Sequence, residues 1–505
     1  MSLSVIHTRA ALGVNAPLVT VEVHISAGLP GLTIVGLPET TVKEARDRVR
    51  SALINSGYMF PAKKITINLA PADLPKEGGR YDLPIAIALL AASEQLTTSR
   101  LDEVEFVGEL ALTGALRGVP GAISAAMEAL RCGRQIVVAQ DNAPEVGLIS
   151  REGCLVAQHL QEVCAWLEGK TTLTQPVSPS KDVHYAEGDL SEVIGQQQGK
   201  RALELTAAGG HNLLFLGPPG TGKTMLASRL NGLLPPLNDE EALESAAILS
   251  LVSTAAPHKH WRQRPFRAPH HSASLTAMVG GGAIPAPGEI SLAHNGVLFL
   301  DELPEFERRV LDALREPIES GHIHISRTRA KISYPARFQL IAAMNPSPTG
   351  HYKGTHSRCS PEQVLRYLAR LSGPFLDRFD ISLEIPLLPS GMLSGPQTEG
   401  ESTHQIRERV MATRQRQLER QNKLNAMLDN HEVRQFCQLQ TRDAQWLEES
   451  LIKLGLSVRA WQRLLKVART IADCEQVDQI RREHIQEALH YRAIDRMLAY
   501  LQKLM

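Results

Sequence analysis

Residues 213–224 read LLFLGPPGTGKT. An apolar run leads into a G-x-x-x-x-G-K-T phosphate loop, and apolar residues at helical spacing follow from Met225 to Leu230. The glycines let backbone N–H groups converge on phosphate oxygens, and the start of the helix adds a partial positive charge. A glycine- and proline-rich turn without a ligand is the alternative. We interpret the loop as a nucleoside triphosphate site that comprises Gly217, Pro218, Pro219, Gly220, Thr221, Gly222, Lys223 and Thr224.

Two side chains at the end of that loop fit the chemistry of a bound triphosphate. Lys223 is expected to reach the β- and γ-phosphates, and Thr224 to ligate Mg²⁺ through its hydroxyl. A second apolar run, residues 297–300, predicts a buried strand that ends in Asp301 and Glu302. Asp301 is expected to hold Mg²⁺ through water, and Glu302 to orient and polarise the attacking water. An acidic helix cap after a strand is the alternative; the predicted cofactors are ATP and Mg²⁺.

The composition is that of a globular protein with several domains. The chain has 505 residues, for which about three domains are expected. Hydrophobic residues make up 43% and charged residues 21%, enough for a sizeable core. The 54 Lys and Arg residues balance 54 Asp and Glu residues. A role on nucleic acid therefore requires local basic patches, because the chain has no overall positive charge.

Cysteine spacing and hydropathy indicate a cytoplasmic protein. The six cysteines are scattered and form no CxxC pair, which suits a reducing compartment. The N-terminus lacks the sustained apolar segment of a secretory signal. The longest apolar stretch, residues 83–92, contains Pro84 and is too short to cross a bilayer. We therefore expect a cytoplasmic location and no membrane contact.

Composition and periodicity divide the chain into an α/β domain, a parallel-sheet ATPase core and a small all-helical domain. The predicted bounds are 1–170, 190–390 and 404–505, with linkers at 171–189 and 391–403. In the first domain the patterns predict strands at 19–25, 64–69, 106–112 and 136–139, and helices at 41–53, 83–92 and 122–130. The charged run 404–420 is interpreted as a solvated helix face.

Two segments of the ATPase core contain no aspartate or glutamate. The first, residues 245–288, carries Lys259, Arg262, Arg264 and Arg267 around Trp261 and Phe266. The second, residues 320–361, carries Arg327, Arg329, Lys331, Arg337, Lys353 and Arg358, and its runs 323–326 and 331–334 predict a β-hairpin. Unpaired positive charge confined to two insertions predicts a surface for a phosphate backbone. Pairing with acidic edges of neighbouring subunits is the alternative.

Several motifs resemble the ComM/YifB family of Mg-chelatase-like AAA+ ATPases. They are the phosphate loop, Asp301–Glu302, a third strand at 338–343 followed by Met344 and Asn345, LSGPFLDRFD at 371–380, SVRAWQRLLKVARTIAD at 457–473 and residues 31–53. The resemblance implies that Asn345 is a sensor of the γ-phosphate, Arg378 an arginine finger for the next subunit and Arg459 the sensor-2 arginine of a lid. For Arg378 the alternative is a surface salt bridge with Asp377 or Asp380. For Asn345 the alternative is a turn before proline, and for Arg459 it is a solvated helix face.

The first domain resembles the Lon-protease-like fold. In Lon proteases a turn like residues 75–87 carries a nucleophilic serine, and a helix like residues 122–130 carries the lysine that activates it. Here the turn reads PKEGGRYDLPIAI without a serine, and the helix reads AISAAMEAL without a lysine. We therefore expect no proteolysis and interpret this domain as a docking or assembly element.

The resemblance also implies an ATP-driven ring, expected to be a hexamer, that moves along DNA and drives branch migration in recombination and natural transformation. An arginine finger requires at least two subunits per site, which favours a closed ring. In the MCM and Mg-chelatase branch the matching hairpin enters the central channel, so Arg327, Arg329 and Lys331 are the implied, sequence-independent DNA contacts. Expected partners are branched or single-stranded DNA, further copies of the chain and recombination proteins. A protein-remodelling ATPase of the Mg-chelatase subunit type and a chaperone are the alternatives.

One further group of side chains raises the question of zinc. His351, His356 and Cys359 lie close together, whereas related sequences often carry several cysteines in this loop. Three candidate ligands without a clear fourth do not make a structural zinc site. The metal that we expect is Mg²⁺ with the nucleotide.

Overall fold

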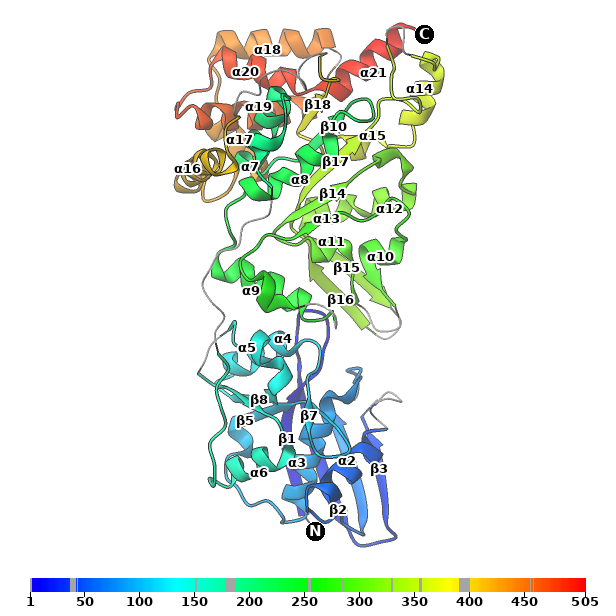
Figure 1. Ribbon diagram of the computed structural model, residues 1–505, viewed down its shortest axis with the longest axis vertical. Coiled ribbons are helices and arrows are strands. Elements are labelled where there is room, and N and C mark those ends of the chain that lie inside the picture. The colour runs from blue at the N-terminus through cyan, green and yellow to red at the C-terminus, as the bar shows by residue number, and fades with distance from the viewer. Residues whose placement is uncertain are drawn as a thin grey trace.

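The computed structural model describes residues 2–36, 42, 44–149, 152–177, 188–252, 256–282, 286–327, 330–353, 357–389, 400–454, 456 and 458–505. An N-terminal α/β body lies at one end, the ATPase sheet in the middle and a group of helices at the other end (Figure 1). None of the described helices combines the length and the hydropathy that a bilayer crossing requires. Of the two predicted linkers, residues 178–187 and 391–399 lie outside the described residues.

The N-terminal body is built on a mixed seven-stranded sheet with the order β3-β4-β2-β1-β5-β8-β9. Strand β2 alternates because Val19, Val21 and Val23 are buried while the residues between them are half-buried. Helix α3 is apolar on all sides and is buried within this body. The elements are β1 (Ser2–Arg9), β2 (Leu18–Ser26), β3 (Gly31–Val35), α2 (Ala45–Asn55), β4 (Lys64–Ala70), α3 (Asp82–Ala92), β5 (Val104–Val107), β6 (Glu109–Leu110), β7 (Leu116–Arg117), α4 (Ala122–Arg131), β8 (Gln135–Ala139), α5 (Ala143–Val146), β9 (Cys154–Ala157) and α6 (Leu160–Leu167).

The structure confirms the α/β character of this body and differs from the sequence patterns in detail. The strand predicted at 106–112 is divided into β5 and β6 because Gly108 bonds to the turn before α3. The Gly108 amide donates to the Arg80 carbonyl, and the Leu83 amide donates to the Gly108 carbonyl, both at 3.1 Å. Strands β1, β3, β7 and β9 were not predicted. The likeness to the Lon-protease-like fold stays a prediction.

The ATPase core is built on a five-stranded sheet with the order β11-β14-β17-β10-β18, in which the paired strands are parallel. Strands β10 and β14 are buried throughout, which explains their unbroken apolar sequences. The strands are β10 (Leu213–Leu216), β11 (Phe266–Arg267), β14 (Val297–Leu300), β17 (Gln339–Met344) and β18 (Ile381–Glu384). The helices are α7 (Gln197–Gly209), α8 (Lys223–Leu233), α9 (Asp239–Leu249), α10 (Leu275–Val279), α11 (Glu289–Leu292), α12 (Arg308–Ala313), α13 (Arg315–Ser320), α14 (Pro361–Leu368) and α15 (Gly373–Leu376).

Two small hairpins project from this core. The first pairs β12 (Gly280–Gly281) with β13 (Ala286–Pro287), and the second pairs β15 (His322–Arg327) with β16 (Ala330–Pro335). The second confirms the hairpin predicted from sequence. Its inner face is buried in the core and is formed by Ile323, Ile325, Ile332 and Tyr334. Its outer face presents His324, Ser326 and Lys331 to solvent.

The C-terminal region is helical, as predicted. Its helices are α16 (Thr403–Gln421), α17 (Asn430–Phe436), α18 (Thr441–Leu454), α19 (Val458–Cys474), α20 (Arg482–His490) and α21 (Ala493–Lys503). The solvated face predicted for residues 404–420 is wrong in part, because α16 packs against α7, α8 and α19. Ile406 and Val410 are buried there. The Arg407 guanidinium donates to the Gly232 carbonyl at 2.6 Å, so part of the charged run ties this region to the ATPase core.

Described residues of the N-terminal body contact the ATPase core at α9 and beside the β15–β16 hairpin (Figure 1). Helix α4 packs on α9, where Ile123 lies in a buried cluster with Ala246 and Ala247. The Gly121 amide donates to the Ser250 carbonyl at 2.8 Å in the same contact. At the second place, the turn between β1 and β2 packs against the core cluster that contains the inner face of the β15–β16 hairpin. The two bodies are therefore joined beside that hairpin.

Candidate nucleotide-binding site

The phosphate loop connects the carboxyl end of β10 to the first turn of α8, as the sequence predicts. Gly222 precedes the helix with φ +85°, a left-handed conformation that favours glycine. A Cβ on Gly217 would lie 2.3 Å from the Ile385 carbonyl oxygen, so only glycine allows the chain to pass β18 at this point. Both glycines are therefore needed for the backbone conformation of the loop.

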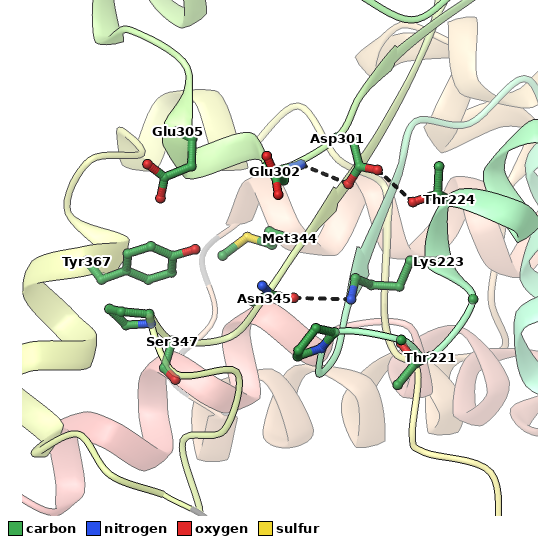
Figure 2. Close-up of a pocket in the computed structure, with 14 residues that line it drawn as sticks. Thr221, Lys223, Thr224, Asp301, Glu302, Glu305, Met344, Asn345, Ser347 and Tyr367 are labelled. Carbon is green, nitrogen blue, oxygen red and sulfur yellow. Dashed lines mark hydrogen bonds between the residues drawn. The ribbon is translucent and has the colours of Figure 1, made fainter. Parts of the chain in front are cut away.

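A cavity of about 650 Å³ lies over the carboxyl ends of β10, β14 and β17 (Figure 2). Parallel strands bring these ends together at one edge of the sheet, which is where α/β proteins place their ligands. Its lining consists of Pro219, Gly220, Thr221, Gly222, Lys223, Thr224, Asp301, Glu302, Glu305, Met344, Asn345, Ser347, Pro348 and Tyr367. The structure thus brings together the predicted loop, the acidic pair and the asparagine in one site.

Lys223 lies at the floor of this cavity and is almost fully buried. Its ammonium group donates to the carbonyls of Gly217 and Pro218 at 2.7 and 2.8 Å. It also donates to the Asn345 side-chain oxygen at 3.2 Å (Figure 2). Burial lowers the pKa of the Lys223 ammonium, and the Asp301 carboxylate opposes this shift. The amine is thereby fixed beside the predicted γ-phosphate sensor.

The predicted Mg²⁺ ligands are in direct contact. The Thr224 hydroxyl donates to Asp301 Oδ2 at 2.6 Å (Figure 2). Hydroxyl and carboxylate oxygens are the hard ligands that Mg²⁺ takes, and the ion usually completes its shell with water and phosphate. Among the described residues, no group of three or more His, Cys, Asp or Glu side chains is placed to hold a metal by itself. The donor set therefore fits a metal that binds together with a nucleotide.

Glu302 projects into the cavity beside Asp301 (Figure 2). Its backbone is left-handed with φ +52°, and its amide donates to Asp301 Oδ1 at 2.8 Å. Left-handed backbone in a residue other than glycine costs energy and is often found at functional sites. One carboxylate oxygen of Glu302 lies 2.9 Å from the imidazole Nδ1 of His271.

Arg378 does not line the cavity of its own chain. It forms an ion pair with Glu319 of α13, and its carbonyl accepts from the Asn212 side chain at 2.9 Å. The alternative considered from the sequence was a salt bridge with Asp377 or Asp380, and the observed partner is a different acid. Of these, Asp377 accepts from Arg463 at 2.9 Å. The role of Arg378 as an arginine finger stays a prediction.

Some predicted site residues lie wholly or partly outside the described residues. Arg329 is one, and nothing is described of the side chains of Arg327 and Arg459, although both lie within elements. Lys331 is described and is exposed on the outer face of the β15–β16 hairpin, opposite Ser326. The DNA contacts therefore stay predictions.

The basic surface predicted for residues 245–288 is wrong in large part, because acids outside the segment neutralise it. Arg262 donates to Asp239 at 2.9 Å. Arg264 lies 3.3 Å from Glu241, and Arg267 makes a bidentate pair with Glu289 at 2.6 and 2.7 Å. The indole of Trp261 packs on the cluster between the N-terminal body and α9. In the second acid-free segment, Arg337 lies 3.0 Å from Glu244 and Lys353 lies 3.2 Å from Glu384.

Several residues of the site were not predicted from sequence. Tyr367 on α14 and Glu305 face the cavity (Figure 2), and Arg370 contacts both side chains. Arg370 Nη1 is 3.2 Å from the Glu305 carboxylate, and its guanidinium lies over the Tyr367 ring at 5.8 Å. No local pattern marks these three residues. His271 had one signal, because it belongs to a histidine pair in a segment without acids.

The loop with His351, His356 and Cys359 gives no test of the zinc question. His356 lies outside the described residues. The thiol of Cys359 lies 3.4 Å from the Thr349 hydroxyl.

Comparison with known proteins gives full-length matches. The family profiles "Magnesium chelatase, subunit ChlI", "Subunit ChlI of Mg-chelatase" and "Magnesium chelatase, subunit ChlI C-terminal" match residues 189–393, 21–142 and 400–492. The chain is 76% identical over 505 residues to YifB of Escherichia coli, an uncharacterized protein, across all of both chains. It is 60% identical over 509 residues to the competence protein ComM of Haemophilus influenzae, again across all of both chains. It is 27% identical over 218 residues to the magnesium-chelatase 38 kDa subunit of Cereibacter sphaeroides, covering 39% of this chain and 58% of that subunit.

Proposed function

This chain belongs to the ComM/YifB family of Mg-chelatase-like AAA+ ATPases, and we propose from that premise that it is a Mg²⁺-dependent ATPase that moves DNA. The observation that carries the ATPase part is the convergence of four predicted residues on one cavity. Thr224 bonds to Asp301, and Lys223 bonds to Asn345. These groups lie at neighbouring strand ends and face the same space.

The chemistry at this site is phosphoryl transfer to water. Backbone N–H groups of the phosphate loop and Lys223 hold the phosphates, while Thr224 and Asp301 hold Mg²⁺, which neutralises charge that develops on the oxygens. Glu302 orients and polarises the attacking water. Asn345 reports the γ-phosphate through its amide. Arg378 supplies positive charge from a neighbouring subunit, which makes the working unit a ring, and we propose a hexamer.

The DNA part of the proposal is supported by the second hairpin and by the relationship to ComM. Strand β15 ends at Arg327 and strand β16 begins at Ala330, and the sequence from 327 to 331 contains Arg327, Arg329 and Lys331. Lys331 is exposed there, while the inner face of the hairpin is anchored in the core. Positive side chains at the end of such a hairpin can bind a phosphate backbone without contacting the bases. One relative is named a competence protein, and this name supports a role on DNA in recombination and natural transformation. The activity that we propose is branch migration. The location that we propose is the cytoplasm.

The test is ATP hydrolysis by the purified full-length chain with Mg²⁺, measured with and without a synthetic three-strand or Holliday-type junction. We expect stimulation by branched DNA, strand displacement, and a steep loss of both with added salt. Lys223→Ala is the control and should abolish nucleotide binding. Hydrolysis that does not respond to any DNA would overturn the DNA part while leaving the ATPase intact.

A second candidate function is remodelling of a protein partner, as a subunit of the Mg-chelatase type. It is favoured by the similarity to the magnesium-chelatase 38 kDa subunit, which extends over 39% of this chain. The same experiment separates the two. Absence of DNA stimulation, together with ATP-dependent binding of a protein partner, would favour remodelling.

A further inference from the structure

The two peptide groups that flank Arg378 are each held by a side-chain donor. The carbonyl of Asp377 belongs to the peptide group before Arg378, and it accepts from the Arg463 guanidinium. A second nitrogen of the same guanidinium donates to Asp377 Oδ1 at 2.9 Å. The carbonyl of Arg378 belongs to the next peptide group and accepts from the Asn212 side chain at 2.9 Å. The backbone that presents Arg378 is therefore fixed on both sides.

These two donors come from different parts of the chain. Asn212 lies directly before β10, and its backbone amide also donates to Asp380 Oδ2 at 3.2 Å. Arg463 lies on α19 of the C-terminal helical region, and 11% of its side chain is exposed. A guanidinium that donates to a carbonyl and a carboxylate at once holds both groups in one orientation, because its donors form a rigid fork. The helical region thus reaches the turn that carries the predicted arginine finger.

Helix α19 is itself a firm support. Leu464 and Val467 are buried in the core cluster that also contains residues of β10. The Thr470 hydroxyl oxygen of the same helix lies 2.7 Å from Nε2 of the fully buried His211. His211 directly precedes Asn212 in the chain. The helix therefore carries one of the two donors and packs against the residue next to the other.

The position of Arg378 decides how much its charge can contribute to catalysis. An arginine finger stabilises charge that develops during phosphoryl transfer, and it does so only when its guanidinium reaches the transferring group. A misplacement of about 1 Å can lower a rate by about 100-fold. In a single chain the Arg378 side chain pairs with Glu319. Its backbone is therefore the part that the fold can hold while the side chain takes a new partner.

We propose that Arg463 is a positioning residue for Arg378, and that it thereby serves the nucleotide of the neighbouring subunit to which its own chain supplies the finger. This inference rests on the proposed function, since it assumes that Arg378 acts on a neighbouring site. It concerns the rate of hydrolysis and leaves nucleotide affinity to the phosphate loop.

Arg463→Met tests the contact, because methionine keeps an apolar stem of similar length and removes every donor. Arg482→Met is the matched control, because Arg482 of α20 donates to Asp443 of α18 at 2.8 Å, an ion pair within the helical region. ATP affinity is measured with a fluorescent ATP analogue, kcat and KM by ATP turnover, and folding by thermal unfolding. We expect Arg463→Met to lower kcat by about 10- to 100-fold, with ATP affinity changed by less than about threefold. Arg482→Met should keep the kcat of the wild type.

Mixed rings show which subunit's site depends on Arg463. Chains with Arg463→Met and chains with Glu302→Gln are co-expressed with different tags and purified through both. A Glu302→Gln chain keeps Arg463 and Arg378 and serves a neighbour that keeps Glu302, so we expect part of the activity to return. The reference is Arg378→Ala mixed with Glu302→Gln. Should Arg463→Met not assemble, Arg463→Lys, which cannot form the fork, takes its place in the same mixture.

The proposal would be overturned if the Arg463 mixture did not recover activity while the Arg378→Ala mixture did, because Arg463 would then act on its own chain alone. An unchanged kcat in Arg463→Met, an equal loss in Arg482→Met, or a matching loss of ATP affinity would also overturn it. If the Arg378→Ala mixture itself fails to recover, the finger assignment is refuted and this inference falls with it. A wild-type chain that hydrolyses ATP without responding to DNA would refute only the DNA part of the proposed function.

Discussion

Arg378 forms an ion pair with Glu319 on its own chain, and neither residue lines the cavity of that chain. The Glu319 side chain is more than half exposed, so this pair lies at the surface of a single copy. The Arg378 side chain itself is mostly buried, with 25% of its surface exposed. A role in catalysis requires a second copy whose nucleotide faces this surface.

The first prediction is that Arg378 acts on a neighbouring subunit. Arg378→Ala should bind ATP normally but fail to hydrolyse it, and Glu302→Gln should do the same. Rings that contain both variants should regain part of the activity, because a subunit with Arg378 then faces a subunit with Glu302. The measurement is ATP turnover of co-expressed, differently tagged chains purified through both tags. No recovery in verified mixed rings, or normal turnover by Arg378→Ala alone, would contradict the assignment.

The second prediction concerns the metal. Asp301→Asn removes the charge from the group that accepts from Thr224 at 2.6 Å. We expect Mg²⁺ dependence of hydrolysis to shift to about 10- to 100-fold higher concentration, with nucleotide binding in a chelator unchanged. A Mg²⁺ titration of the hydrolysis rate checks this, with Glu305→Gln as the control because Glu305 lines the same cavity without contacting Thr224. The same Mg²⁺ midpoint in Asp301→Asn and the wild type would exclude Asp301 from the metal site.

The core of the site could be predicted from sequence because its residues follow buried parallel strands. Apolar runs locate β10 and β14, and the carboxyl ends of neighbouring parallel strands must meet, so Lys223, Asp301 and Asn345 had to converge. Tyr367 reaches the cavity from α14, a helix that no sequence motif connects with the phosphate loop.

The local sequence could not predict which basic residues form ion pairs with acids. A segment without acids looks basic, yet Arg267 is neutralised by Glu289, which lies one residue beyond the segment's end. The helix α9 likewise brings Asp239 to Arg262 across the loop between them. Ion pairs depend on tertiary contacts, so an acid-free window gives only an upper limit on exposed positive charge.

The third prediction follows from a partly buried carboxyl group on α5 of the N-terminal body. Burial raises the pKa of Glu145 on α5 to about 7 from its ordinary 4.5, and a hydrogen bond from Asn142 opposes the rise. A raised folded-state pKa means that the folded chain binds this proton more tightly than the unfolded chain. Its contribution to stability is therefore full below about pH 4.5 and is lost as the pH rises to about 7.

Glu145→Gln should remove that loss. Above pH 7 the variant should be more stable than the wild type by about 1 kcal/mol, roughly 2–4 °C in Tm, and the difference should vanish near pH 4.5. Thermal unfolding of both chains across this pH range measures it. Asp82, whose pKa burial raises to about 6, is present in both chains, so its effect cancels in the difference. Parallel Tm curves would show that Glu145 does not titrate in this way.

The last prediction separates the hairpin from the basic residues around it. Lys331 is exposed on the outer face of the β15–β16 hairpin, whereas Arg337, in the same acid-free segment, is already 3.0 Å from Glu244. Lys331→Ala should weaken binding of DNA of any sequence and lower the slope of log K against log salt by about 1. Arg337→Ala should leave that slope unchanged, because its charge is already balanced within the chain. The measurement is fluorescence anisotropy of a labelled junction with the assembled protein and a non-hydrolysable ATP analogue, over a range of salt. Equal slopes for Lys331→Ala and the wild type, or an equal drop in both variants, would remove the hairpin from the DNA-binding surface.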